Sequence, residues 1–155
     1  MTKFSVLMSV YSKDDASFLE RALTSIYEEQ TQKPDEIVVV FDGPLTEALY
    51  GVLDLFAKDK KNVVKYLPQA ENKGLGEALR IGSEACTGDY IFRMDSDDIS
   101  HPLRFEKQAA YVEAHPDVDV VGSDISEFYE SYTEEEMRVR ALKFRITEEE
   151  EREPC

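Results

Sequence analysis

Short apolar runs alternate along the chain with stretches of helical periodicity, and this alternation constrains the fold more than any other feature. The runs are rich in β-branched and aromatic residues, which predicts strands over residues 4–10, 36–41, 63–67, 90–94 and 118–125. In the intervals apolar residues recur at three- and four-residue spacing, which predicts helices over residues 18–27, 45–56, 75–86 and 103–114. Parallel neighbours need crossover connections, and continuously apolar strands need cover on both sides. The sequence therefore predicts an α/β fold with a doubly wound, mostly parallel sheet.

Polar residues follow three of the predicted strands. The segments are YSKDD (residues 11–15), DGP (42–44) and DSDD (95–98). In open sheets of this kind ligands bind beyond the carboxyl ends of the strands, so these three loops are expected to meet at one edge. An aromatic ring at Tyr11, an acceptor at Asp42 and the acidic cluster could together hold a base, a sugar hydroxyl and a metal ion.

The acidic cluster places Asp95, Asp97 and Asp98 within four consecutive residues. A diphosphate beside three carboxylates is repelled by about 4 kcal/mol for each pair of unit charges at 4 Å and an effective dielectric constant of 20. A divalent cation removes this repulsion, and hard oxygen ligands suit Mg²⁺ or Mn²⁺. The alternative is a solvated turn with a helix cap, and taken alone the segment favours that interpretation.

Other segments also carry two interpretations. DGP is a common β-turn sequence, and ENKGLGEALRIG (71–82) is either a phosphate-facing loop with Lys73 and Arg80 as cations or a glycine-rich turn before a helix. The sequence has neither GxGxxG after the first predicted strand nor GxxxxGK[ST] anywhere, so the phosphates must be held in another way. The missing glycine-rich loop also disfavours a nucleotidyltransferase.

Composition excludes some partners. The 155 residues suit one domain, and 18 Lys and Arg against 33 Asp and Glu give a net charge of −15, which repels nucleic acid and anionic membranes. The two cysteines form neither a disulfide ladder nor a zinc motif. No apolar stretch is long enough for a membrane span or signal peptide, so we expect a cytoplasmic protein.

Taken together, the motifs resemble those of the family 2 glycosyltransferases, over roughly residues 3–128. Five elements occur in the order of that family, namely the Tyr11 loop, the Asp42 turn, Asn72-Lys73-Gly74, Gly88-Asp89-Tyr90 and Asp95-Ser96-Asp97-Asp98. The resemblance implies a Rossmann-like GT-A fold that binds a nucleotide-sugar. It also implies that Tyr11 and Asp42 contact the base, that Lys73 lies near the base or phosphates and that Asp95 lies near the ribose or sugar. Asp97 and Asp98 would hold Mn²⁺ or Mg²⁺, with Asp97 the first choice for the direct bond.

The activity implied by the resemblance is inverting transfer of a sugar from a nucleotide diphosphate, with UDP favoured, to a hydroxyl of a saccharide or lipid-linked acceptor in surface polysaccharide synthesis. Residues 1–130 would be the donor half, and residues 131–155 an acidic extension at the start of a truncated acceptor half. We therefore expect an amino-terminal fragment of a longer enzyme, with the catalytic base beyond residue 155. We also expect this fragment to self-associate through its truncated end. The full-length enzyme would work at the inner face of the membrane. The alternative function is a non-catalytic module that binds sugar-nucleotides or a protein partner.

Overall fold

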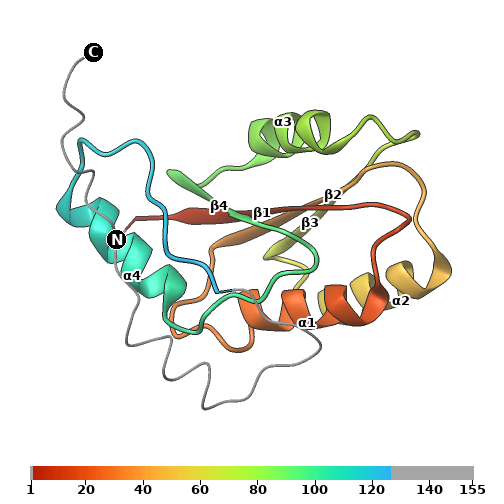
Figure 1. Ribbon diagram of the computed structural model, residues 1–155, viewed down its shortest axis with the longest axis horizontal. Helices are drawn as coiled ribbons and strands as arrows, with labels where there is room; N and C mark the ends of the chain where they lie inside the picture. Colours follow the sequence, from red (N-terminus) through yellow and green to blue (C-terminus); the bar gives the residue numbers. More distant parts are fainter. Residues whose placement is uncertain (1, 127–155) are drawn as a thin grey trace. The chain divides into compact units, whose positions relative to one another are not determined.

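A computed structural model describes residues 2–126 and contains four strands and four helices (Figure 1). The strands are β1 (Phe4–Val10), β2 (Glu36–Phe41), β3 (Val64–Pro68) and β4 (Tyr90–Met94). The helices are α1 (Ala16–Ile26), α2 (Glu47–Ala57), α3 (Leu75–Ala85) and α4 (Arg104–Ala114). Strands and helices alternate as predicted, with small shifts at the ends of the elements.

All pairings within the sheet are parallel, and the strand order is β3-β2-β1-β4. The chain therefore builds outward from β1 to β3 and then returns to place β4 on the other side of β1. Ser5 pairs with Glu36 of β2 on one side and with Ile91 of β4 on the other. Such a reversal of strand order is a topological switch point, and in open α/β sheets ligands bind outside the carboxyl ends of the strands at such a point, here β1 and β4.

β1 and β2 are buried throughout most of their length, because helices cover both faces of the sheet. In Figure 1, α3 lies on one face of the sheet, and α1 and α2 lie on the other. Leu7, Val38 and Val40 pack with Ala78 of α3. The larger core on the opposite face joins residues of alternate strand positions to α1, α2 and the first half of α4, and its largest fully buried members include Phe4, Met8, Leu19, Leu23, Ile37, Leu49, Leu53 and Phe105. The predicted doubly wound parallel sheet is confirmed.

The predicted fifth strand over residues 118–125 is wrong. The described residues after α4 form no strand, and Val120 and Ile125 are 86% and 87% exposed. A strand forms only where another backbone pairs with it, and within residues 2–126 no segment pairs with this run. Alternating apolar residues indicate a tendency to form a strand, but a strand does not form where no neighbouring backbone pairs with the segment.

By its contacts the chain divides into two compact units, Met1–Ala110 and Tyr111–Cys155, so the first unit carries the whole sheet. The division predicted at residue 130 and the extension over 131–155, with its expected self-association, fall outside the described residues and stay predictions. No helix in the described part of the chain has the length and apolar character that crossing a bilayer requires.

Candidate functional site

The site is built where β1 and β4 end side by side. The hydroxyl of Ser96, after β4, donates a hydrogen bond of 2.9 Å to Oδ2 of Asp14, after β1. The same Oδ2 accepts a bond of 3.0 Å from the backbone N–H of Tyr11. Asp14 therefore joins the Tyr11 loop to the acidic loop, as the parallel topology predicts for segments at one sheet edge.

Asp14 was missed as a site residue by the sequence reasoning, although YSKDD was identified as a site loop. Burial raises the pKa of the Asp14 carboxyl, while the hydrogen bonds from Tyr11 and Ser96 act to lower it. The charge of Asp97 adds to the upward shift, so Asp14 is electrostatically part of the acidic cluster. The sequence signal that could have identified Asp14 is an acidic residue three positions after Tyr11, in a turn where its carboxylate can accept a bond from the N–H of Tyr11.

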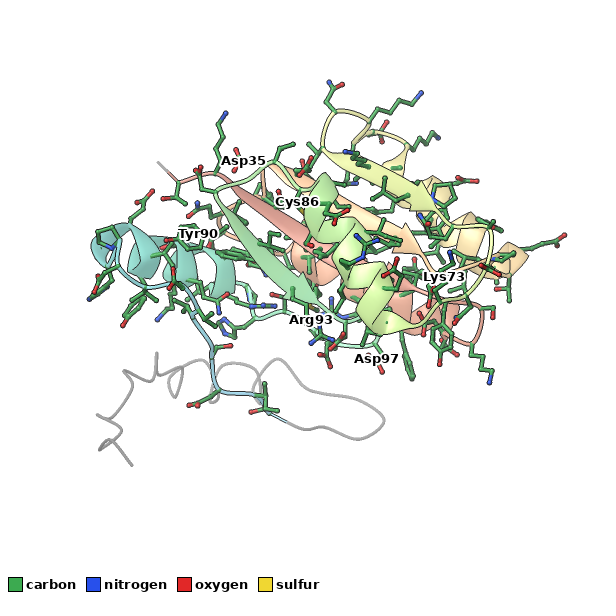
Figure 2. All side chains as sticks on the ribbon, turned by 90° about the horizontal axis from the view of Figure 1, so that it is seen from above. Asp35, Lys73, Cys86, Tyr90, Arg93 and Asp97 are labelled. Atoms are coloured by element: carbon green, nitrogen blue, oxygen red, sulfur yellow. The ribbon has the colours of Figure 1, made fainter. Side chains whose placement is uncertain are left out.

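The acidic loop crowds its three carboxylates at the end of β4. Asp95 forms an ion pair with Arg93, while Asp97 and Asp98 are exposed to solvent. Figure 2 shows Arg93 and Asp97 at the carboxyl end of β4, with Asp35, Cys86 and Tyr90 toward the opposite end of the strands. Partial burial raises the pKa of Asp98, and the charges of Asp95 and Asp97 raise it further. The charges of Arg104 and Arg93 act to lower the pKa of Asp98, but burial and the like charges prevail.

A cationic side chain that sequence reasoning missed lies next to this loop. The guanidinium of Arg104 in α4 donates 2.9 Å to the backbone carbonyl of Arg93 and 3.1 Å to Oε1 of Gln108. Burial lowers the pKa of Arg104, whereas the charges of Asp98 and Asp95 raise it. Arg104 thus partly offsets the negative charge of the acidic loop from the protein side.

The donor set fits a hard divalent cation that is shared with a ligand. Carboxylate oxygens of Asp97 and Asp98 are the ligands that Mg²⁺ and Mn²⁺ prefer, and Mg²⁺ commonly takes only one or two protein carboxylates together with phosphate oxygens and water. Among residues 2–126 no group of three or more acidic, histidine or cysteine side chains is arranged as a complete metal site. The assignment of Asp97 and Asp98 as metal ligands therefore stays a prediction.

Asp42 holds two loops together at the end of β2. Its side chain is 5% exposed, and its carboxylate oxygens accept bonds of 2.7 Å from the N–H of Lys73 and 3.0 Å from that of Gly74. Gly43 beside it has φ of +86°, and a Cβ there would lie 2.8 Å from the backbone N of Asn72. The DGP segment is thus a turn packed against the loop over 71–74, and the contact of Asp42 with a base stays a prediction.

The remaining candidates differ in how freely they can meet a ligand. Tyr11 is 40% exposed, and the ammonium of Lys73 lies 3.5 Å from Glu71 on a side chain that is 54% exposed. Arg80, by contrast, pairs with Glu77 at 2.8 Å and Glu84 at 2.6 Å on the surface of α3. Of the two cations considered from the sequence, Lys73 is therefore the more available, although its phosphate or base contact stays a prediction.

Comparison with known families then decides where the chain belongs. The sequence model described as Glycosyl transferase family 2 matches residues 5–153. The chain belongs to this family. The resemblance drawn from the five motifs is confirmed, and with it the assignment to a family of glycosyltransferases.

Curated glycosyltransferases resemble the chain over about four fifths of its length. The amylovoran biosynthesis glycosyltransferase AmsE of Erwinia amylovora is 46% identical over 127 residues, which cover 82% of this chain and 47% of that protein. The UDP-Gal:alpha-D-GlcNAc-diphosphoundecaprenol beta-1,3-galactosyltransferase of Escherichia coli is 40% identical over 126 residues, covering 81% and 45%. The chain spans about half the length of the curated relatives it matches.

Solved structures confirm the GT-A fold. S. aureus TarS 1-349 in complex with UDP-GlcNAc superposes with a TM-score of 0.63 at 24% identity, covering 74% of this chain and 32% of that one. The mannosyltransferase PcManGT from Pyrobaculum calidifontis, in complex with GDP-Man and Mn²⁺, gives a TM-score of 0.64 at 20% identity, covering 79% and 34%. At these identities the likeness concerns the fold.

Proposed function

We propose that this chain is the donor-binding part of an inverting, metal-dependent glycosyltransferase. The observation that carries the proposal is the hydrogen bond between Ser96 and Asp14, which brings an exposed aromatic loop and an acidic loop together at the switch point of the sheet. The donor is a sugar nucleotide, with UDP as the nucleotide. The acceptor is a hydroxyl of a saccharide or lipid-linked saccharide in bacterial surface polysaccharide synthesis.

The names of related proteins and the ligands in related structures support the proposed donor and acceptor. The name of the Escherichia coli relative specifies a UDP-galactose donor and a diphosphoundecaprenol-linked acceptor, and that of the Erwinia relative specifies amylovoran biosynthesis. Two structural neighbours are complexes with UDP-GlcNAc and with GDP-Man and Mn²⁺. We propose that the reaction takes place in the cytoplasm, at the inner face of the membrane, where a lipid-linked acceptor would be anchored.

Within this proposal each candidate residue has a distinct role. Tyr11 lies against one face of the base and Asp42 contacts its edge, while Lys73 binds the base or the phosphates. Asp95 orients the ribose or the sugar, and Asp97 and Asp98 hold the cation. A bound Mn²⁺ or Mg²⁺ supplies a Lewis acid for the charge that develops on the leaving diphosphate.

Asp42 can fill its role only through a limited set of contacts. Its two oxygens already accept backbone N–H bonds, and each carboxylate oxygen has room for one further donor such as a base N–H. The bonds to Lys73 and Gly74 fix the loop that carries the Lys73 ammonium. No residue in the described part of the chain is assigned as catalytic base, and we place that base in the portion of the relatives that this chain does not match.

Calorimetric titration of UDP tests the proposal. We expect binding in the presence of Mn²⁺, loss of binding with excess chelator, and weakening by about ten-fold or more in Asp97→Ala. Asp59→Ala is the matched control, because Asp59 is an exposed carboxylate in the turn after α2. Binding that persists with chelator would overturn the metal-dependent donor site, and tighter binding of GDP than of UDP would overturn the choice of nucleotide.

A further inference from the structure

A buried amide outside the predicted site is hydrogen-bonded to the segment that follows the acidic loop. Gln30 follows α1, and its side chain is 3% exposed. Neither the motif analysis nor the proposed donor contacts assign it a role. Burying a primary amide is costly unless its donors and acceptor are all paired.

Gln30 pairs all of its polar atoms, and most of its partners lie 70 or more residues away in sequence. Its Nε2 lies 2.7 Å from the carbonyl of Ser25, 2.9 Å from the carbonyl of His101 and 3.2 Å from Oγ of Ser100. Its Oε1 accepts a bond of 3.3 Å from the N–H of Phe105, near the start of α4. One side chain thereby connects the end of α1 to the backbone between the acidic loop and α4.

Ser25 completes the connection. Its hydroxyl is fully buried, accepts a bond of 2.9 Å from the N–H of Ser100 and donates one of 2.7 Å to the carbonyl of Ala22. Ser100 is itself 2% exposed. We call Gln30, Ser25 and Ser100 the Gln30 latch.

The position of the latch gives it a consequence for the site. Ser100 is two residues beyond Asp98, and Ser96 at the other side of the two carboxylates is bound to Asp14 at 2.9 Å. Asp97 and Asp98 therefore project to solvent from a short segment whose two ends are both hydrogen-bonded to the α1 side of the fold. A core made only of apolar side chains would fill the same space, but it would not specify where the backbone of Ser100 lies.

We propose that Gln30 is a positioning residue for the cation site of this enzyme. Gln30 holds Ser100 and the backbone of His101 in place. The position of this backbone in turn determines the distance between the carboxylate oxygens of Asp97 and Asp98. Mg²⁺ demands near-ideal octahedral geometry, so a small displacement of the loop weakens the site without removing a ligand. The inference rests on the proposed function, because it assumes that Asp97 and Asp98 bind the cation.

Two Gln30 variants separate the amide from the space it occupies. Gln30→Met keeps the length of the side chain and removes every hydrogen bond, while Gln30→Glu keeps an acceptor for Phe105 and loses the donor to His101. Ser5→Ala is the matched control, because Ser5 is equally buried and joins β1 to Glu36 at 2.7 Å and to Gly88 at 2.9 Å, at the amino ends of the strands. Ser25→Ala is the milder latch variant, to be used should both Gln30 variants fail to fold.

Each folded variant is assayed for Mn²⁺ binding by electron paramagnetic resonance of free Mn²⁺ in the presence of UDP, and for unfolding by urea. Both Gln30→Met and Ser5→Ala are expected to lose stability, but only the latch variants should raise the dissociation constant for Mn²⁺, by about ten-fold. An unchanged dissociation constant in the latch variants, or an equal rise in Ser5→Ala, would overturn the inference.

Hydrogen exchange in the absence of ligand keeps the two proposals apart. The amides of Ser100 and Phe105 should exchange faster in the latch variants than in Ser5→Ala, and equal rates would overturn the positioning role whatever the chain binds. If the unmodified chain binds no Mn²⁺ with UDP, the proposed function fails, and with it the metal-binding part of the inference. Exchange then still decides whether Gln30 holds the loop.

Discussion

At the scale of single residues, Asp42 combines a candidate ligand contact with a measurable contribution to stability. Asp42→Ala removes the buried acceptor of two partly buried backbone N–H groups, and each group left unsatisfied costs about 1–3 kcal/mol. We expect the free energy of unfolding to fall by about 2–4 kcal/mol in urea titration. Asp59→Ala, at an exposed carboxylate, should change it by less than about 0.5 kcal/mol. A loss in Asp42→Ala no larger than in this control would mean that the two N–H bonds contribute nothing to stability.

Asp98 should destabilise the folded chain at neutral pH when no cation is present. Burial and the charges of Asp95 and Asp97 raise its pKa, so the folded chain holds this proton at pH values where the unfolded chain has lost it. The contribution of Asp98 to the free energy of unfolding therefore falls as the pH rises from its pKa in the unfolded chain to its higher pKa in the folded chain. In chelator, Asp98→Asn is expected to be more stable than the unmodified chain at about pH 7, with a gain that shrinks toward about pH 4.

Asp59→Asn serves as the control for this pH profile, since its carboxylate is exposed. Urea unfolding at a series of pH values measures both. A gain in Asp98→Asn that is independent of pH would contradict an origin in charge, and a loss at neutral pH would show that the Asp98 carboxylate makes a stabilising contact.

At the scale of elements, glycines mark where the backbone comes too close for a side chain. A Cβ on Gly88, before β4, would lie 2.6 Å from the backbone N of Ser5 in β1. Gly88→Ala should therefore cost about 1–3 kcal/mol by forcing the strands apart. Gly51 in α2 has no atom within 4 Å of such a Cβ, so Gly51→Ala should gain about 0.5–1 kcal/mol from helix propensity. Thermal unfolding of the pair checks the opposite signs, and a loss in both would contradict the steric argument.

The helices and strands within the sheet were predictable because local pattern and final environment agree. Asp15, for example, caps α1 by accepting bonds of 2.8 Å from Ser17 and 3.2 Å from Phe18, as its position before an amphipathic run indicates. The run over 118–125 has the same local pattern as the real strands but no pairing partner in the described chain. Its failure shows that strand prediction tests a tendency, whereas pairing is a tertiary event.

At the scale of the whole molecule, the net charge of −15 should make stability depend on salt. The Debye length shortens from about 30 Å at 0.01 M salt to about 3 Å at 1 M, which weakens repulsion across the fold. We expect the unfolding temperature at pH 7 to rise with NaCl over this range. The rise should vanish near the isoelectric point of about 4.5, where the net charge is lost. A fall at pH 7 would show that ion pairs such as Arg80 with Glu77 and Glu84 outweigh the net repulsion.

The sequence by itself determined the order of elements, the doubly wound parallel sheet and the family, because strand and helix periodicities are local and the five motifs are read in order. It also placed Tyr11, Asp42 and the acidic cluster in loops at one edge, since parallel strands share a direction. Only the tertiary structure decided which groups meet there. The hydrogen bonds of Ser96 with Asp14 and of Gln30 with Ser100 join residues that are 82 and 70 positions apart in the chain, and such bonds depend on a packing that no local pattern encodes.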